Sequence, residues 1–241
     1  MIKNLLRITA LTSALIIPLH AANITVVAPN ANTTTAGSQA QYGLFNSGNA
    51  NFQWLLGASQ FSAVPIGSQV TSIGFRFIEG PSNGAAVTFP QWNLQLSSSL
   101  YAVGSLTTTF NSNVGPDAVS VRSGPLTIPA GSFQGPGLPS YPFFLIALTT
   151  PYTYTGNDLL ATLSITGAGN GFAVDAAAPD GIGDTVGVIG SNAAIGRSHF
   201  FNYPITEYVF STPNQVPEPS TCALFGSGLL GFLALTQRRR R

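Results

Sequence analysis

The sequence predicts an all-β domain, a single antiparallel β-sandwich that is jelly-roll-like, and three observations lead to this fold class. Gly and Pro are abundant, at 26 and 17 residues, whereas charged residues make up only 7% of the chain. Apolar and polar residues alternate with period two in several short segments. Clusters of turn-forming residues separate these segments, and away from the two ends no long segment carries an apolar stripe of helical period. Many short strands joined by turns are typical of a sandwich.

Alternation defines the strands that we expect. Ile73, Phe75 and Phe77 fall on one face, because successive side chains of a strand point to opposite faces. The segments with this pattern are 71–77, 92–97, 119–122 and 159–166. In the second segment the alternation puts Trp92 in phase with two leucines, so we expect its ring in the core.

Other segments give weaker or different signals. Residues 143–148 form a continuous apolar run, which predicts a strand buried on both faces. Residues 52–61 leave two interpretations open, a short helix or a strand followed by a turn. The turn-rich gaps lie at 79–85, 111–117 and 129–142.

The chain begins with the features of a secretory signal. Lys3 and Arg7 supply positive charge, an apolar run follows, and Ala21 and Ala22 offer small residues to signal peptidase. The run is too short to span a bilayer comfortably. We therefore expect residues 1–21 to be a signal peptide that the secretion translocon and signal peptidase handle. Cleavage after Ala22 and an uncleaved anchor are the alternatives.

Residues 216–241 combine three parts with separate physical roles. Pro217 and Pro219 lack backbone N–H groups and disfavour helix, which keeps Glu218 in an extended, accessible stretch. A transmembrane helix is predicted over 220–236. Its uncharged part reaches about 24 Å, against about 30 Å for the hydrocarbon core. Four arginines follow the helix. Their charges cannot cross the membrane easily and stay on the cytoplasmic side, so the domain before the helix faces outward. They are Arg238, Arg239, Arg240 and Arg241.

This order of Val-Pro-Glu-Pro-Ser-Thr, apolar helix and arginine cluster resembles the PEP-CTERM sorting signal. Exosortases, membrane-embedded cysteine proteases or transpeptidases of mostly Gram-negative bacteria, process that family. Some catalogues call the same tail an ice-binding protein C-terminal domain, a name that implies no ice binding here. The resemblance implies that Pro217, Glu218 and Pro219 form the recognition triplet, and that the arginines form the basic end. Cys222 departs mildly from the family's pattern, which often has an aromatic residue there.

The resemblance also implies a route. The chain is expected to be exported, to pass through an inner-membrane intermediate held by the C-terminal helix, and to reach the cell surface or the extracellular matrix. The domain in question is 22–210, followed by a linker at 211–215. This middle region is similar to uncharacterised β-rich ectodomains that often precede such tails, a likeness that implies no particular chemistry.

The charge of the middle region excludes one class of partner. It holds three arginines against seven carboxylates, which leaves a net charge of −4. Without a basic patch, nucleic-acid binding is not expected. The single cysteine, Cys222, lies in the terminal helix, so the middle domain has no disulfide.

Few residues of the middle region carry recognisable chemistry. There is no G-x-S-x-G elbow and no H-E-x-x-H metal pattern. The only histidine there, His199, stands beside two phenylalanines, and we expect it to be structural. A catalytic residue is therefore not assigned, and we do not expect an enzyme.

Two pairs of residues are candidates for ligand contact. Asp180 and Asp184 flank a Gly-Ile-Gly turn, where oxygen ligands can hold Ca²⁺; a plain turn is the alternative. Tyr152 and Tyr154 stand among Thr and Pro, which makes them candidates for exposed rings that contact a glycan; a place in the core or on the ordinary surface is the alternative. No other cofactor is expected.

These observations favour a non-enzymatic surface or extracellular-matrix protein, structural or adhesive, in an exopolysaccharide or biofilm setting. Extracellular polysaccharide is the partner that this setting suggests. A carbohydrate-binding module is the second hypothesis, and a polysaccharide hydrolase on a β-sandwich is the third.

Overall fold

Strands, paired antiparallel, make up 50% of the residues that the computed structural model describes. The structure describes residues 22–45, 48–78, 83–133, 142–167, 172–198 and 201–213, which belong to one unit, Ala22–Pro213. The prediction of an all-β domain is confirmed. Among the described residues, no helix has the length and apolar character needed to cross a membrane. The expected signal peptide at 1–21 and the expected helix at 220–236 lie outside the described residues.

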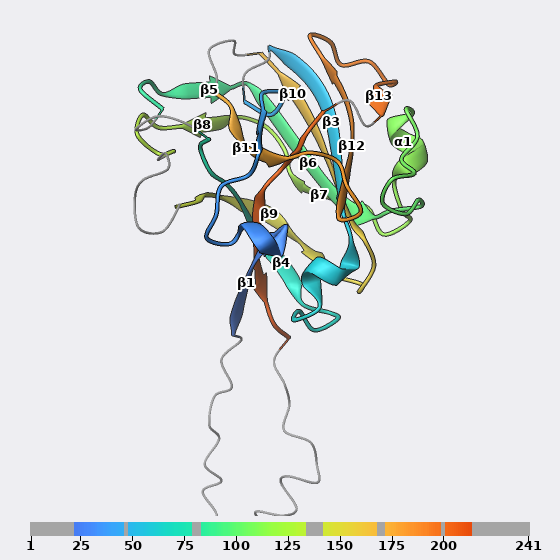
Figure 1. Ribbon diagram of the computed structural model, residues 1–241. Coiled ribbons are helices and arrows are strands. Elements are labelled where there is room, and N and C mark those ends of the chain that lie inside the picture. The colour runs from blue at the N-terminus through green and yellow to red at the C-terminus, as the bar shows by residue number, and fades with distance from the viewer. Residues whose placement is uncertain are drawn as a thin grey trace, which may run out of the picture. The chain divides into compact units, whose positions relative to one another are not determined.

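Two sheets carry most of the strands (Figure 1). The four-stranded sheet has the order β1 (Asn23–Ala28), β15 (Thr206–Ser211), β4 (Gln69–Phe75) and β9 (Phe144–Thr153). The six-stranded sheet has the order β13 (Arg197–Ser198), β12 (Gly183–Ile189), β3 (Asn49–Leu56), β10 (Leu159–Thr166), β6 (Gln91–Ser98) and β7 (Val119–Arg122).

Smaller elements complete the unit. A three-stranded sheet has the order β14 (Tyr203–Pro204), β11 (Val174–Ala177) and β2 (Gln39–Gln41), and β5 (Val87–Phe89) pairs with β8 (Leu126–Ile128). The helical turns are η1 (Asn30–Asn32), η2 (Ala58–Phe61) and α1 (Phe110–Asn113).

The predicted strands are present, with one correction. All four alternating segments overlap strands, and 52–61 proves to be a strand, β3, followed by the turn η2. The prediction that 143–148 is buried on both faces is wrong. Within β9, Ile146 is buried but Leu145 is 46% exposed. The reason is position: β9 is the edge strand of its sheet, and nothing among the described residues covers the outer face of that strand at Leu145.

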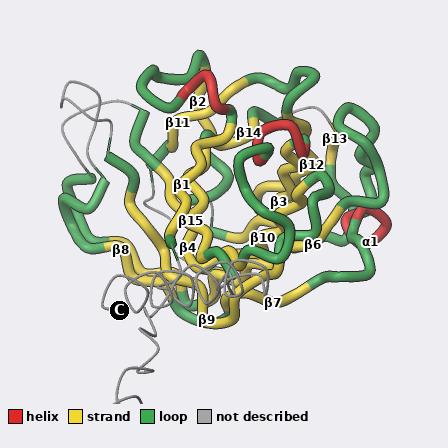
Figure 2. Tube along the Cα trace, turned by 90° about the horizontal axis from the view of Figure 1, so that it is seen from below, coloured by secondary structure: helices red, strands yellow, loops and turns green. Residues whose placement is uncertain are grey.

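One core joins the two large sheets, which Figure 2 shows next to each other. Trp54 of β3 donates from Nε1 to the Tyr208 hydroxyl of β15 at 3.1 Å, so a hydrogen bond crosses between the sheets. Trp92 is fully buried, as predicted, and stacks with Phe45 at 6.2 Å between ring centres. Burial raises the pKa of the Tyr208 hydroxyl. A jelly-roll connectivity of these sheets stays a prediction.

A second, smaller cluster lies on the other side of the six-stranded sheet. The segment that connects β6 to β7 folds back over the sheet and places Leu106 and Phe110 against Leu55, Leu160 and Val186. This segment covers only part of that outer face. The uncovered part is polar.

A buried ion pair ties the end of β4 to β11. Nε of Arg76 lies 2.7 Å from Oδ2 of Asp175, and both side chains are 0% exposed. The Gly37 amide donates to both carboxylate oxygens, and Arg76 also donates to the carbonyl of Thr35. Burial raises the pKa of Asp175, while the arginine and the amide act in the opposite direction.

Candidate functional site

The two ends of the described unit are fastened to each other. The Thr212 amide donates to the Ala22 carbonyl at 2.9 Å, and the Ala22 amide donates to the Thr212 hydroxyl oxygen at 3.1 Å. Figure 1 shows the start of β1 and the end of β15 side by side. Ala22 is one of the two predicted cleavage residues, and Ala21 lies outside the described residues. The predicted signal peptide and the predicted sorting tail therefore join the domain at one place.

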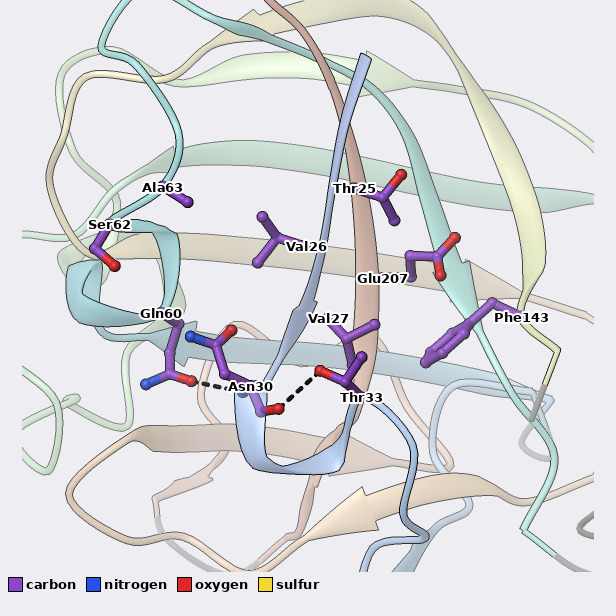
Figure 3. A pocket seen from close by; sticks show the side chains of 10 residues that line it. All are labelled: Thr25, Val26, Val27, Asn30, Thr33, Gln60, Ser62, Ala63, Phe143 and Glu207. Atoms are coloured by element: carbon purple, nitrogen blue, oxygen red, sulfur yellow. Dashed lines mark hydrogen bonds between the residues drawn. The ribbon is translucent and has the colours of Figure 1, made fainter. Parts of the chain in front are cut away.

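A pocket lies beside β1 and has a volume of about 510 Å³ (Figure 3). Its lining combines one carboxylate, two amides, three hydroxyls, an aromatic ring and small apolar side chains. The residues are Thr25, Val26, Val27, Asn30, Thr33, Gln60, Ser62, Ala63, Phe143 and Glu207. Such a mixture suits a ligand with many hydroxyl groups better than an apolar one.

Glu207 supplies the carboxylate from the outer face of β15. Its neighbours Thr206 and Tyr208 are buried, so strand alternation turns Glu207 to the other side. On the adjacent strand Gly74 makes room for it: a Cβ there would lie 3.2 Å from the Glu207 Cβ and 2.9 Å from Leu145 Cδ2. Burial raises the pKa of Glu207, and the Arg76 charge opposes that rise.

The rest of the lining is held by the turns η1 and η2. The backbone amide of Asn30 donates to Oε1 of Gln60 at 2.8 Å, and the Thr33 hydroxyl donates to the backbone carbonyl of Asn30 at 2.7 Å (Figure 3). The Phe143 ring has the buried Arg76 guanidinium 5.0 Å from its centre. This pocket was not predicted from the sequence. The alternation of 206–211 was a usable signal for Glu207, but nothing in the sequence brings Gln60 or Phe143 to it.

The chemistry available in the pocket is hydrogen bonding. Glu207 is the single carboxylate among the residues that line it. Glycoside hydrolysis of the usual kind needs two carboxyl groups, about 5–9.5 Å apart. The lining can donate hydrogen bonds to a hydroxyl-bearing ligand and accept them from it. It does not itself supply a pair of carboxyl groups.

The predicted calcium residues do come together. Asp180 and Asp184 line one pocket of about 460 Å³ with Gly104, Pro179 and Gly183. Their carboxylates are engaged with the protein, however. Asp180 Oδ1 accepts from the Ile182 and Gly183 backbone amides at 2.8 and 3.1 Å, the pattern of the plain turn that was the alternative.

Asp184 has a similar anchoring role. It is buried in β12, and its Oδ2 accepts from the Gly104 and Leu106 amides, both at 3.2 Å. It thereby fixes the segment between β6 and β7. The described part of the chain shows no group of three or more His, Cys, Asp or Glu side chains placed to hold a metal ion. A calcium ion here stays a prediction.

Of the two interpretations of Tyr152 and Tyr154, the structure supports the core position and contradicts exposed rings. Tyr152 is 1% exposed and donates its hydroxyl to Oδ2 of Asp117 at 2.7 Å. Tyr154 is 3% exposed and packs against Phe61 and Phe210. Both side chains belong to the core between the two large sheets, so neither ring offers a face to a sugar. His199 and the residues of the sorting triplet lie outside the described residues.

These features define an all-β domain in which the two ends of the described unit, Ala22 and Thr212, lie at one place. The comparison with protein families gives the class of the tail. The model of the PEP-CTERM protein-sorting motif matches residues 215–241. The chain thus carries this motif, as the resemblance implied, which indicates an exported protein that an exosortase sorts on its way through the membrane to the cell surface. The comparison with curated proteins gave no match.

Proposed function

We propose that this protein is a non-enzymatic component of the cell surface or extracellular matrix, with a structural or adhesive role among exopolysaccharides. The observation that supports this proposal is the sorting motif at 215–241, which follows an all-β domain whose first and last described segments are hydrogen-bonded to each other. A domain held at one place leaves its remaining surface free for contact with the matrix. A jelly-roll-like sandwich is the architecture that we propose for it.

Deletion of the gene tests this role. The expected result is weaker surface attachment, less flocculation or altered matrix composition, restored by the wild-type gene on a plasmid. If attachment, flocculation and matrix composition all stay at the wild-type level, the proposed role is wrong.

Sorting through the tail has its own test, independent of the role at the surface. Glu218→Ala or removal of Arg238–Arg241 should leave an unprocessed precursor in the inner membrane, seen as a larger band in membrane fractions. Asn214→Ala, outside the motif, is the matched control and should be processed normally. Normal size and location of both altered tails would contradict exosortase handling.

A carbohydrate-binding module is the second candidate, and the pocket beside β1 favours it. Glu207 accepts hydrogen bonds, two amides and three hydroxyls stand around it, and Phe143 adds a ring. The full chain should bind immobilised glycans, and Glu207→Gln should weaken that binding about tenfold, since hydrogen bonds to a charged acceptor are the stronger kind. Binding that Glu207→Gln leaves unchanged would remove the pocket from this function.

A polysaccharide hydrolase is the third candidate. The raised pKa of Glu207 is what a general acid needs, but a second carboxyl is missing from the pocket lining. Release of reducing sugar from a panel of polysaccharides, abolished by Glu207→Gln, would be required to support it.

A further inference from the structure

Nine uncharged polar side chains form a regular array on the outer face of the six-stranded sheet. They stand on its three adjacent strands β3, β10 and β6, and pairing aligns them in three rows, each an amide, a hydroxyl and an amide. The rows are Asn49–Thr166–Gln91, Asn51–Ser164–Asn93 and Gln53–Thr162–Gln95.

Strand alternation places the whole array on the side away from the core. Phe52, Leu163 and Leu94, which stand one position along the three strands, are all buried in the core. Exposure falls from the first row, which is exposed, to the second, which is half-buried, and then to Gln53, which is buried. Gln53 is buried because α1 lies over it and accepts its hydrogen bond at the Phe110 carbonyl, 3.0 Å away.

The array is partly held by the protein and partly free. Asn51 donates to the Ala193 carbonyl at 3.0 Å, and Asn93 Oδ1 accepts from the Gly124 amide at 2.9 Å. Within the described part of the chain, the side chains of Gln91, Gln95 and Ser164 have no hydrogen-bond partner. Donors and acceptors in fixed positions are therefore left facing solvent.

We propose that this array binds an uncharged polysaccharide chain that runs across the strands, along the rows. The inference rests on the proposed function only for the setting, a polysaccharide matrix. Amides donate and accept, as sugar hydroxyls do, so each row offers complementary partners. Neighbouring strands lie about 4.8 Å apart, close to the length of one pyranose unit, so successive sugars meet successive strands.

The lack of charge on the array indicates which class of polysaccharide it binds. None of the nine side chains carries a charge, and Arg122 of the neighbouring β7 donates to the Pro125 carbonyl at 2.9 Å. The array thus has no set of cations with which to bind uronate, sulfate or phosphate groups. Without an aromatic residue in the array, binding depends on hydrogen bonds and is insensitive to salt.

The test uses two matched double variants of the full chain, purified in mild detergent. Gln95→Ala with Ser164→Ala removes two free side chains of the array. Gln69→Ala with Ser72→Ala removes the same residue types from the outer face of β4 in the other sheet. Affinity electrophoresis in gels containing a neutral β-glucan, dextran or alginate measures binding, and thermal unfolding checks that both variants fold.

The wild type and the β4 variant should be retarded by a neutral polysaccharide, equally at low and high salt, and not by alginate. The array variant should bind about tenfold more weakly, because two hydrogen bonds are lost. Gln91→Ala, at an exposed position, should weaken binding by a smaller factor and provides a second variant if the double variant does not fold.

Several results would overturn the array as the site. Equal binding by both double variants, salt-sensitive binding to alginate alone, no binding to any neutral polysaccharide, or a dimer that only the array variant loses would each do so. Loss of binding in Glu207→Gln but not in the array variant would move the site to the pocket beside β1. The attachment phenotype of the gene deletion decides the proposed function separately.

Discussion

At the scale of the residue, Asp117 joins three parts of the chain through one carboxylate. The Ser98 amide and hydroxyl donate to Oδ1, both at 2.7 Å, and the Tyr152 hydroxyl donates to Oδ2. Burial alone would raise the pKa of Asp117, but these hydrogen bonds outweigh it and hold the pKa below 3.8. The ionised carboxylate therefore stabilises the folded state, and the stabilisation is lost as pH falls through the folded pKa.

We expect Asp117→Asn to lower the free energy of unfolding by about 1–2 kcal/mol at pH 7, because the carboxylate is partly exposed and accepts charge-assisted hydrogen bonds. The difference in unfolding free energy between the variant and the wild type should shrink below about pH 3.8. There Asp117 becomes protonated first in the unfolded state and, at lower pH, in the folded state. Urea unfolding of the wild type and the variant at pH 7 and pH 3 measures this difference in free energy. A difference that is the same at both pH values would contradict the assigned role.

The buried ion pair between Arg76 and Asp175 is the second feature at the residue scale. Asp175→Asn leaves the buried arginine without its carboxylate, and we expect a loss of about 3–5 kcal/mol. Replacing both residues, as Arg76→Met with Asp175→Leu, should cost less than Asp175→Asn alone, because no buried charge then remains. Chemical unfolding of the two variants measures this order, and the opposite order would show that the pair stabilises by its net attraction.

At the scale of the element, two glycines two positions apart have opposite environments at the start of β12. A Cβ at Gly183 would lie 2.7 Å from the Tyr203 ring, whereas a Cβ at Gly181 would have nothing within 4 Å. We expect Gly183→Ala to lower the free energy of unfolding by about 1–3 kcal/mol through overpacking. Gly181→Ala should change it by less than about 0.5 kcal/mol. Similar losses in both variants would show that the tyrosine can move aside.

At the scale of the whole molecule, Thr212 closes the unit by holding Ala22. β1 is an edge strand, which pairs only with β15 among the described strands. The hydrogen bond from the Thr212 hydroxyl to the Ala22 carbonyl therefore holds the start of an edge strand in place. Thr212→Val should lower the free energy of unfolding by about 1 kcal/mol and speed amide exchange in β1, since a hydroxyl that both donates and accepts is lost. Thr212→Ser keeps the hydroxyl and is the control. Equal exchange rates in both variants would show that backbone pairing alone holds the ends.

How far the sequence reaches depends on the range of the interactions involved. Alternation is local, so the strands around Phe75, Trp92 and Leu163 were predictable. The burial of Tyr152 was not, because it depends on contacts with distant segments, among them Asp117 in the turn before β7. The pocket had one local signal, the outward phase of Glu207, but its other walls come from turns far along the chain.

The sorting route of this protein and the type of its elements follow from the sequence alone. A sorting motif is read as a contiguous stretch of chain, and strand periodicity is a property of neighbouring residues. Which residues share a surface depends instead on how the strands and turns come together in three dimensions. The rows of the polar array exist because β3, β10 and β6 pair in one register, and the pocket exists because two turns close over β1. Register and closure arise from contacts between distant segments, and no local pattern records them.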